Sequence, residues 1–171
     1  MKIGYIIVAI LLAANIYQFA HTPLPEEGEV VLVADREYFS VARQLIENAN
    51  TSVRLIAFNA KYYSKYPDSK TNVLLDALAG ARDRGVDVRV VVDEFDKDAR
   101  NVVNMLRARG IDARLDGADV TTHAKVLVVD DYVLIGSTNW SFTSFEKNHE
   151  ANVLVRSRGL AKDMERYFDS L

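Results

Sequence analysis

The sequence predicts an α/β fold in which a mixed central β-sheet is flanked by helices on both faces. From residue 29 to about residue 115, short apolar runs alternate with segments whose apolar residues recur every three or four positions. Strands separated by helices pair in parallel through right-handed crossovers, which place the helices on the faces of the sheet. Beyond residue 120, two apolar runs flank Asp130-Asp131, a turn signal that indicates an antiparallel hairpin.

Seven strands and four helices follow from this pattern. Before the hairpin we expect strands and helices to alternate at 30–34, 38–49, 53–58, 71–81, 86–92, 99–109 and 111–115. From the hairpin onward we expect strands at 124–129, 132–135 and 151–155 and a last helix at 160–171. Asp35 and Thr71 are the expected N-caps of the first two helices, and Gly110 is the expected end of the third.

The composition limits the chain to one domain without thiol chemistry. Its 171 residues, of which 49% are hydrophobic, suit a single core of ordinary size. A net charge of −3 gives no overall attraction to nucleic acid or anionic lipid, so a polyanion site has to be a local cluster of cations. The absence of cysteine excludes disulfides, thiolate metal sites and a cysteine nucleophile.

The N-terminal segment differs in kind from the rest. Residues 3–20 carry no charge and no polar face, which predicts a membrane-spanning anchor near the short end of the usual length. A cleaved signal peptide is the alternative, although the residues before Ala20 lack the small-residue pattern of a cleavage site. Lys2 on one side and acidic residues on the other predict an extracytoplasmic domain, secreted or periplasmic if the helix is cleaved. We therefore divide the chain into an anchor or signal peptide at 1–21, a linker at 22–28 and a folded domain at 29–171.

Several chemically active residues surround the predicted hairpin. Side chains alternate faces on a strand, so His123 and Lys125 at the start of the first hairpin strand are expected to point the same way. Gly136 permits a tight turn after the second strand, where Ser137 and Asn139 can supply hydrogen-bond donors. A nucleophile, a cation and such donors suit an oxyanion. One histidine, one lysine and one asparagine do not make a zinc or magnesium site, so we expect no metal and no cofactor.

Seven residues with this spacing resemble the HKD signature of the phospholipase D superfamily. The matching residues are His123, Lys125, Asp130, Gly136, Ser137, Asn139 and Glu150. Chance agreement at fixed spacing is on the order of one in a billion windows. The interval between Asp130 and Gly136 is one residue shorter than the family pattern. The resemblance covers nearly all of the chain after residue 29 and implies a phospholipase D-like sandwich, with 29–171 as a catalytic domain that holds a single motif.

The resemblance implies metal-independent phosphodiester cleavage through a phosphohistidine. His123 is the implied nucleophile, while Lys125 and Asn139 neutralise the phosphate oxygens. Glu150 is our candidate for the carboxylate that holds the imidazole in the attacking tautomer.

Two further motif residues are expected to support the site. Asp130 is expected to pin the motif or to pair with the lysine, and Ser137 to hold the phosphate or the glutamate in place.

A single motif lacks the acid that protonates the leaving oxygen. In the family a second HKD histidine supplies that proton, whereas the other histidines of this chain, His21 and His149, are not followed by a matching lysine. The resemblance therefore implies a homodimer through the motif face, with two copies of His123 in one groove.

The segment 58–67 is the candidate substrate contact. It interleaves cations with tyrosines, among them Lys61 and Tyr63, and cations with stacking rings suit single-stranded nucleic acid. A solvated loop whose tyrosines pack on the domain is an equal alternative. Trp140 is expected to be a packing residue.

Three classes of function remain open at this stage. The leading one is an endonuclease that cleaves nucleic-acid phosphodiesters, because single-motif members of the family are nucleases. The second is a phospholipase D that hydrolyses or transfers phospholipid headgroups, which the predicted anchor favours. The third is a non-catalytic polyanion-binding module, which would need cations but no nucleophile.

Overall fold

The computed structural model describes residues 23–95, 97–117 and 119–171. Its strands are β1 (Val30–Ala34), β2 (Ser52–Ala57), β3 (Asp87–Val92), β4 (Asp112–Leu115), β5 (Lys125–Val129), β6 (Tyr132–Gly136) and β7 (Ala151–Arg156). Its helices are α2 (Glu37–Glu47), α3 (Lys70–Asp83), α4 (Ala99–Ala108), α5 (Phe142–Glu146) and α6 (Arg158–Ser170).

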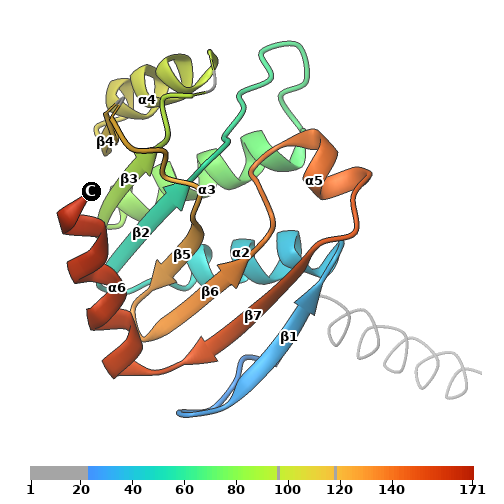
Figure 1. Ribbon diagram of the computed structural model, residues 1–171, viewed down its shortest axis with the longest axis vertical. Helices are drawn as coiled ribbons and strands as arrows, with labels where there is room; N and C mark the ends of the chain where they lie inside the picture. The colour runs from blue at the N-terminus through green and yellow to red at the C-terminus, as the bar shows by residue number, and fades with distance from the viewer. Residues whose placement is uncertain (1–22, 96, 118) are drawn as a thin grey trace, which may run out of the picture.

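The strands form one mixed sheet in the order β1-β7-β6-β5-β2-β3-β4 (Figure 1). β2, β3 and β4 are parallel and are connected through α3 and α4, as the alternating pattern predicted. The remaining pairs are antiparallel, including the predicted hairpin of β5 and β6, in which Val129 pairs with Tyr132. The prediction of an α/β fold with a mixed sheet is confirmed.

Helices cover both faces of the sheet, but unequally. Buried residues of α2, α3 and α4 join the larger core cluster on one face, while α6 alone closes the smaller cluster on the other. Along β5 the side chains alternate between these clusters, so Leu127 belongs to the first and Val126 and Val128 to the second. Lys125 therefore starts the row that faces α2 and α3, opposite the α6 side.

Both predicted helix caps are wrong. Ser69, and not Thr71, is the N-cap of α3, because its hydroxyl accepts a hydrogen bond from the Asn72 N–H at 3.4 Å. Asp35 adopts a positive φ of 48°, and its carboxylate accepts the Glu150 N–H at 2.7 Å instead of capping α2. The short helix α5 was not predicted, since five residues are too few to give a periodic pattern.

The predicted anchor at 1–21 lies outside the described residues. Within the ranges that the structure describes, no helix is both long enough and apolar enough to cross a membrane.

Candidate active site

His123 lies two residues before the first residue of β5, in the region where the end of β2 pairs with the start of β5 (Figure 1). The Phe58 N–H donates to the Ala124 carbonyl at 3.1 Å and joins the two chain segments there. The ring of Phe58 packs against the imidazole with 4.3 Å between centroids, which leaves the histidine exposed on its other side. The sequence placed His123 at the head of the strand, whereas the regular pairing begins only at Lys125.

The ammonium of Lys125 lies beside the imidazole. Its Nζ is 3.3 Å from His123 Nδ1 and 3.4 Å from Nε2, and it donates to the His123 carbonyl at 2.7 Å. The same Nζ lies over the Phe58 ring, 4.6 Å from its centroid. Burial lowers the pKa of Lys125 below its ordinary value of 10.5, against the opposing charges of Glu150 and Asp93. The His123 imidazole and the Lys125 ammonium therefore lie side by side, as predicted.

We expect the lowered pKa of Lys125 to set an alkaline limit to catalysis. The cation is required to neutralise phosphate, and it is lost as pH rises through the pKa, so kcat/KM should fall at a lower pH than ordinary lysine titration would give. A Lys125→Arg variant keeps its charge at all these pH values, and its residual activity should lack this fall. Profiles of kcat/KM between about pH 7 and pH 11 measure the difference. Identical alkaline limbs in both proteins would contradict the assignment.

Asp93 is a site residue that the sequence analysis missed. It is 2% exposed, directly after β3, and its carboxylate accepts the Thr122 N–H at 2.6 Å and the Phe95 N–H at 2.8 Å. Because Thr122 precedes His123, this carboxylate fixes the backbone that presents the imidazole. The sequence contained a signal for Asp93, since a carboxylate at the carboxyl end of a parallel strand lies where ligand sites commonly form.

Ser137 and Glu150 are brought together, as predicted. The Ser137 hydroxyl donates to Glu150 Oε2, and the Ala151 N–H donates back to the hydroxyl at 3.1 Å. Glu150 is 7% exposed, and its other oxygen accepts from the Asn148 amide at 2.9 Å. Ser137 therefore holds the glutamate, which is one of the two roles predicted for it.

Glu150 makes no hydrogen bond to His123 among the described residues, and its two oxygens accept instead from Ser137 and Asn148. Its negative charge instead raises the pKa of Lys125, in partial opposition to burial. The Glu150 carboxylate therefore interacts electrostatically with the Lys125 ammonium. A contact of Glu150 that holds the tautomer of His123 stays a prediction.

Gly136 is required by close packing and not by its φ. A Cβ at this position would lie 2.4 Å from both the Ala151 carbonyl oxygen and Asn152 Oδ1. Asn152 is 3% exposed and binds Thr138 through its amide, at 2.9 Å to the hydroxyl and 3.2 Å to the N–H. Only glycine therefore lets β6 approach β7 closely enough to place Ser137 beside Glu150.

Asn139 follows this turn and has a side-chain oxygen that is unpaired in the described part of the chain. Its Oδ1 is buried and has no hydrogen-bond partner among the described residues, while its N–H donates to Ser144 Oγ at 3.3 Å. The neighbouring Trp140 is 1% exposed and donates through Nε1 to the Tyr38 hydroxyl at 3.1 Å, so it packs in the core as predicted. Burial raises the pKa of Tyr38 to about 12, which keeps this hydroxyl neutral.

Asp130 lies away from the His123–Lys125 pair and binds backbone groups. It lies at the opposite end of β5 from Lys125, about 16 Å away at strand spacing, which rules out the predicted pairing with that lysine. Its carboxylate accepts the backbone N–H groups of Asn50 at 2.9 Å, Thr51 at 2.8 Å and Ser52 at 3.0 Å. The alternative prediction, that Asp130 pins the motif, matches this geometry.

Replacement of Asp130 by alanine should destabilise the fold by about 2 kcal/mol, since three N–H groups lose a charged acceptor. Alanine also tolerates the positive φ of 51° at this position poorly. The matched control is Asp131→Ala, which removes only an exposed contact to Arg158 at 3.5 Å and should change stability little. Urea unfolding measures both variants, and equal midpoints would contradict the pinning role.

The two candidate substrate contacts, Lys61 and Tyr63, already have partners in the fold. Lys61 Nζ forms an ion pair with Asp98 at 2.8 Å. The Tyr63 hydroxyl accepts the Phe142 N–H at 3.0 Å. Both lie in the segment that follows β2, close to the residues around Asn139, because the Lys61 N–H donates to the Trp140 carbonyl at 2.9 Å. Contact of either residue with substrate stays a prediction.

The site therefore combines an exposed imidazole, a cation and a glycine-dependent polar turn. The profile described as "Cardiolipin synthase, PLD-like domain" matches residues 42–171, which include every residue of the predicted signature. The chain belongs to this phospholipase D family. Within the described residues, no three His, Asp or Glu side chains come together as a metal site would require.

Known proteins of this family are similar to the chain at moderate identity. The structure of Nuc from Salmonella typhimurium, a phospholipase D family member, superposes with a TM-score of 0.71 at 27% identity, covering 84% of this chain and 93% of Nuc. Phospholipase D of Rickettsia prowazekii is 28% identical over 121 residues, which are 70% of this chain and 55% of the relative. The mitochondrial cardiolipin hydrolase of Xenopus tropicalis is 32% identical over 90 residues, which are 52% of this chain and 43% of the relative.

The phospholipase D-like sandwich that the resemblance implied is confirmed by the superposition on Nuc. The chain spans about half of the length of the two curated relatives, so their complete activities do not transfer to it directly.

Proposed function

We propose that the protein is a metal-independent phosphodiesterase that works through a phosphohistidine on His123, and that it acts as an endonuclease on nucleic acid. One observation carries the proposal: the exposed imidazole has both ring nitrogens within hydrogen-bond range of the Lys125 ammonium, at 3.3 and 3.4 Å. A nucleophile and a cation at this separation match the needs of attack on an anionic phosphodiester.

Two displacements at phosphorus complete the reaction. A neutral imidazole nitrogen of His123 bonds to phosphorus, and the bond to the leaving oxygen breaks as that oxygen takes a proton from an acid. Water then bonds to phosphorus, the phosphorus–nitrogen bond breaks, and the conjugate base of the acid takes the proton of the water. In both steps the Lys125 ammonium neutralises charge on the non-bridging oxygens, and the Asn139 side-chain NH2 group donates a hydrogen bond to them.

The acid in this scheme comes from a second copy of the chain. The described residues contain two histidines, and the imidazole of His149 is 97% exposed and lies 3.1 Å from Asp35, which ties it to that carboxylate. We therefore propose a homodimer through the face that carries His123, so that the imidazole of one subunit attacks while that of the other donates the proton. The exposure of His123 leaves it accessible to a partner.

Two classes of substrate are candidates for this phosphodiesterase. The lysines and tyrosines of segment 61–66 favour nucleic acid, because they offer cations and stacking rings near the site. The similarity to a phospholipase D and to a cardiolipin hydrolase, together with the predicted anchor, favours a phospholipid as the second candidate.

Parallel assays discriminate between these substrates. The full chain is incubated with end-labelled single-stranded DNA and with vesicles of phosphatidylcholine and cardiolipin, and the His123→Asn protein is the control for contaminating enzymes. Cleavage of the DNA by the wild-type protein alone supports the endonuclease. Headgroup release with intact DNA assigns a phospholipase D instead, and activity on neither substrate would support the third class, a polyanion-binding module.

Treatment with EDTA is expected to leave the activity unchanged within about twofold, because the cation that neutralises phosphate is Lys125 and not a metal ion. The measurement compares initial rates before and after dialysis against EDTA, and after addition of Mg²⁺ to the dialysed protein. A loss that only Mg²⁺ restores would contradict the mechanism.

A further inference from the structure

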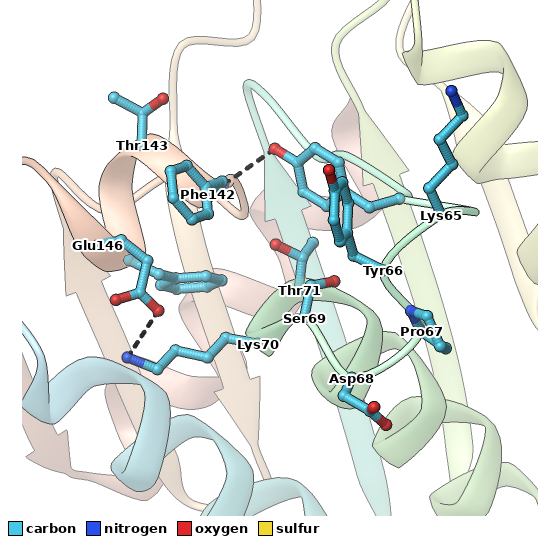
Figure 2. A pocket seen from close by; sticks show the side chains of 12 residues that line it. Lys65, Tyr66, Pro67, Asp68, Ser69, Lys70, Thr71, Phe142, Thr143 and Glu146 are labelled. Atoms are coloured by element: carbon cyan, nitrogen blue, oxygen red, sulfur yellow. Dashed lines mark hydrogen bonds and ion pairs between the residues drawn. The ribbon is translucent and has the colours of Figure 1, made fainter.

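A cavity of about 1000 Å³ lies between the segment 63–71 and α5 (Figure 2). The helix α5 follows the turn at residues 136–139, which we call the catalytic turn because it carries Ser137 and Asn139. Four aromatic residues line the cavity, Tyr63, Tyr66, Phe142 and Phe145, together with Thr71 at the beginning of α3. The charged lining residues are Lys65 and Lys70, and Asp68 and Glu146. Neither the signature residues nor the proposed mechanism uses this space.

The cavity lies against α5, which directly follows the turn that carries Asn139. Asn139 lies three residues before Phe142 and donates its N–H to Ser144 of α5, so the catalytic turn and α5 form one unit. The Phe142 N–H in turn donates to the Tyr63 hydroxyl, which joins α5 to the opposite wall (Figure 2). The wall that α5 provides is therefore fixed relative to Asn139.

The opposite wall is held in place by one buried amide. Asn72 of α3 is 2% exposed, and its side chain binds the Tyr63 N–H at 3.0 Å, the Tyr63 carbonyl at 2.9 Å and the Tyr66 carbonyl at 3.1 Å. These three bonds fix the segment that carries the tyrosines. The cavity is thus formed before any ligand arrives.

Two of the aromatic side chains are exposed, unlike core residues. Tyr66 is 68% exposed and Phe142 is 50% exposed, and Figure 2 shows them on opposite sides of the cavity. Cations lie close to both walls, since Lys65 lines the cavity and Lys147 Nζ is 5.8 Å from the centroid of the Phe142 ring. Of the two acidic lining residues, Glu146 is paired with Lys70 at 3.0 Å. Exposed rings with flanking cations are the arrangement that binds stacked bases next to phosphates.

One polar group in the wall lacks a partner. The hydroxyl of Thr71 is buried, in a residue that is 1% exposed, and it makes no hydrogen bond within the described part of the chain. In Figure 2 its side chain projects from the start of α3 toward the cavity. An occupant with a polar edge, such as a nucleobase, would pair this hydroxyl, whereas an acyl chain would leave it unpaired.

We propose that this cavity is the binding site for one unpaired base of a single-stranded nucleic acid, in the nucleotide next to the phosphate that is cleaved. The inference rests on the proposed nuclease function and adds to it a requirement for an unpaired strand. The base stacks between Tyr66 and Phe142, and the adjoining phosphates contact Lys65 and Lys147.

Single abasic nucleotides placed along a 12-nucleotide strand test the proposal. For the wild-type protein, kcat/KM should fall about tenfold when the abasic nucleotide is next to the cut, and little when it is elsewhere. The Phe142→Ala protein should be about tenfold slower on the intact strand and should show no further loss with the abasic strand, because the stacking partner is already absent. The control is Tyr167→Ala, which removes a 43% exposed ring from α6 and should preserve the wild-type pattern.

Failure of this inference differs from failure of the nuclease function. If the wild-type protein cleaves every abasic strand equally, the endonuclease stands and the base site is overturned. If no strand is cleaved and labelled phosphatidylcholine or cardiolipin is cleaved, both proposals fall, and slower lipid turnover by Phe142→Ala would assign the cavity to an acyl chain. Circular dichroism of each variant confirms that the exposed substitutions leave the fold unchanged.

Discussion

Replacement of His123 by asparagine is expected to lower phosphodiester cleavage by about 10⁴-fold or more, with no large change in the free energy of unfolding. The imidazole is exposed and contacts mainly the Phe58 ring and the Lys125 ammonium, so little buried packing is lost. Asparagine cannot form the covalent bond to phosphorus, which closes the route through the intermediate. Initial rates on labelled substrate and urea unfolding of the same preparation measure the two quantities.

The matched control is His149→Asn. This histidine is 97% exposed, and its contact is with Asp35 outside the catalytic cluster, so the variant should retain wild-type activity. Acid-sensitive phosphorylation of the wild-type protein, trapped by rapid denaturation and located by mass spectrometry, should appear on His123 and be absent from His123→Asn. A phosphorylated peptide elsewhere in the chain would overturn the assignment of the nucleophile.

Mixing the two forms of His123 tests the shared site. If each site needs both imidazoles, a heterodimer of wild-type and His123→Asn subunits is inactive, so excess variant should suppress the wild-type rate after subunit exchange. A rate that depends only on the amount of wild-type subunit, or full activity in a monomeric preparation, would refute the homodimer.

Substitution of Lys125 by methionine should reduce kcat by about 10³-fold, the second largest effect we expect. Methionine keeps most of the length of the side chain and its packing against the Phe58 ring, while it removes the charge that lies 3.3 Å from the imidazole. The loss therefore measures electrostatic stabilisation of the phosphate oxygens and not a change in the core. Rates at saturating substrate, with circular dichroism as a check on folding, give the comparison.

Two further variants serve as controls for Lys125→Met. Lys125→Arg should recover part of the activity, since it restores charge but not the compact geometry of an ammonium. Lys162→Met removes an exposed lysine from α6 and should leave the rate unchanged. If Lys125→Met loses no more activity than Lys162→Met, the cation has no role in the reaction.

The sequence predicted the sheet well because burial leaves a strong signal there. The bounds of β1 are those expected, and the other strands start or end within one residue of the prediction, since each is a run of apolar side chains bounded by turn residues. The hairpin followed from Asp130-Asp131, which does form the turn. Alternation along β5 likewise gave the correct faces for Lys125 and Val126.

The errors concern polar side chains whose partners are distant in the chain. Asp130 binds residues about 80 positions away, and Asp35 binds the backbone of Glu150, 115 positions away, so no local pattern could assign these contacts. The contacts of Asp93 with Thr122 and of Phe58 with His123 were missed for a related reason. Each residue directly follows a strand, which the sequence indicated, but its contact forms only when the sheet brings β2, β3 and β5 together.

The partial burial of Lys125 also has a consequence for chemical reactivity. A lowered pKa gives this amine a larger neutral fraction at a given alkaline pH than a lysine with the ordinary pKa of 10.5 would have. We therefore expect electrophiles that acylate neutral amines to react preferentially with Lys125, and a phosphate-like inhibitor that occupies the proposed site to shield it from them.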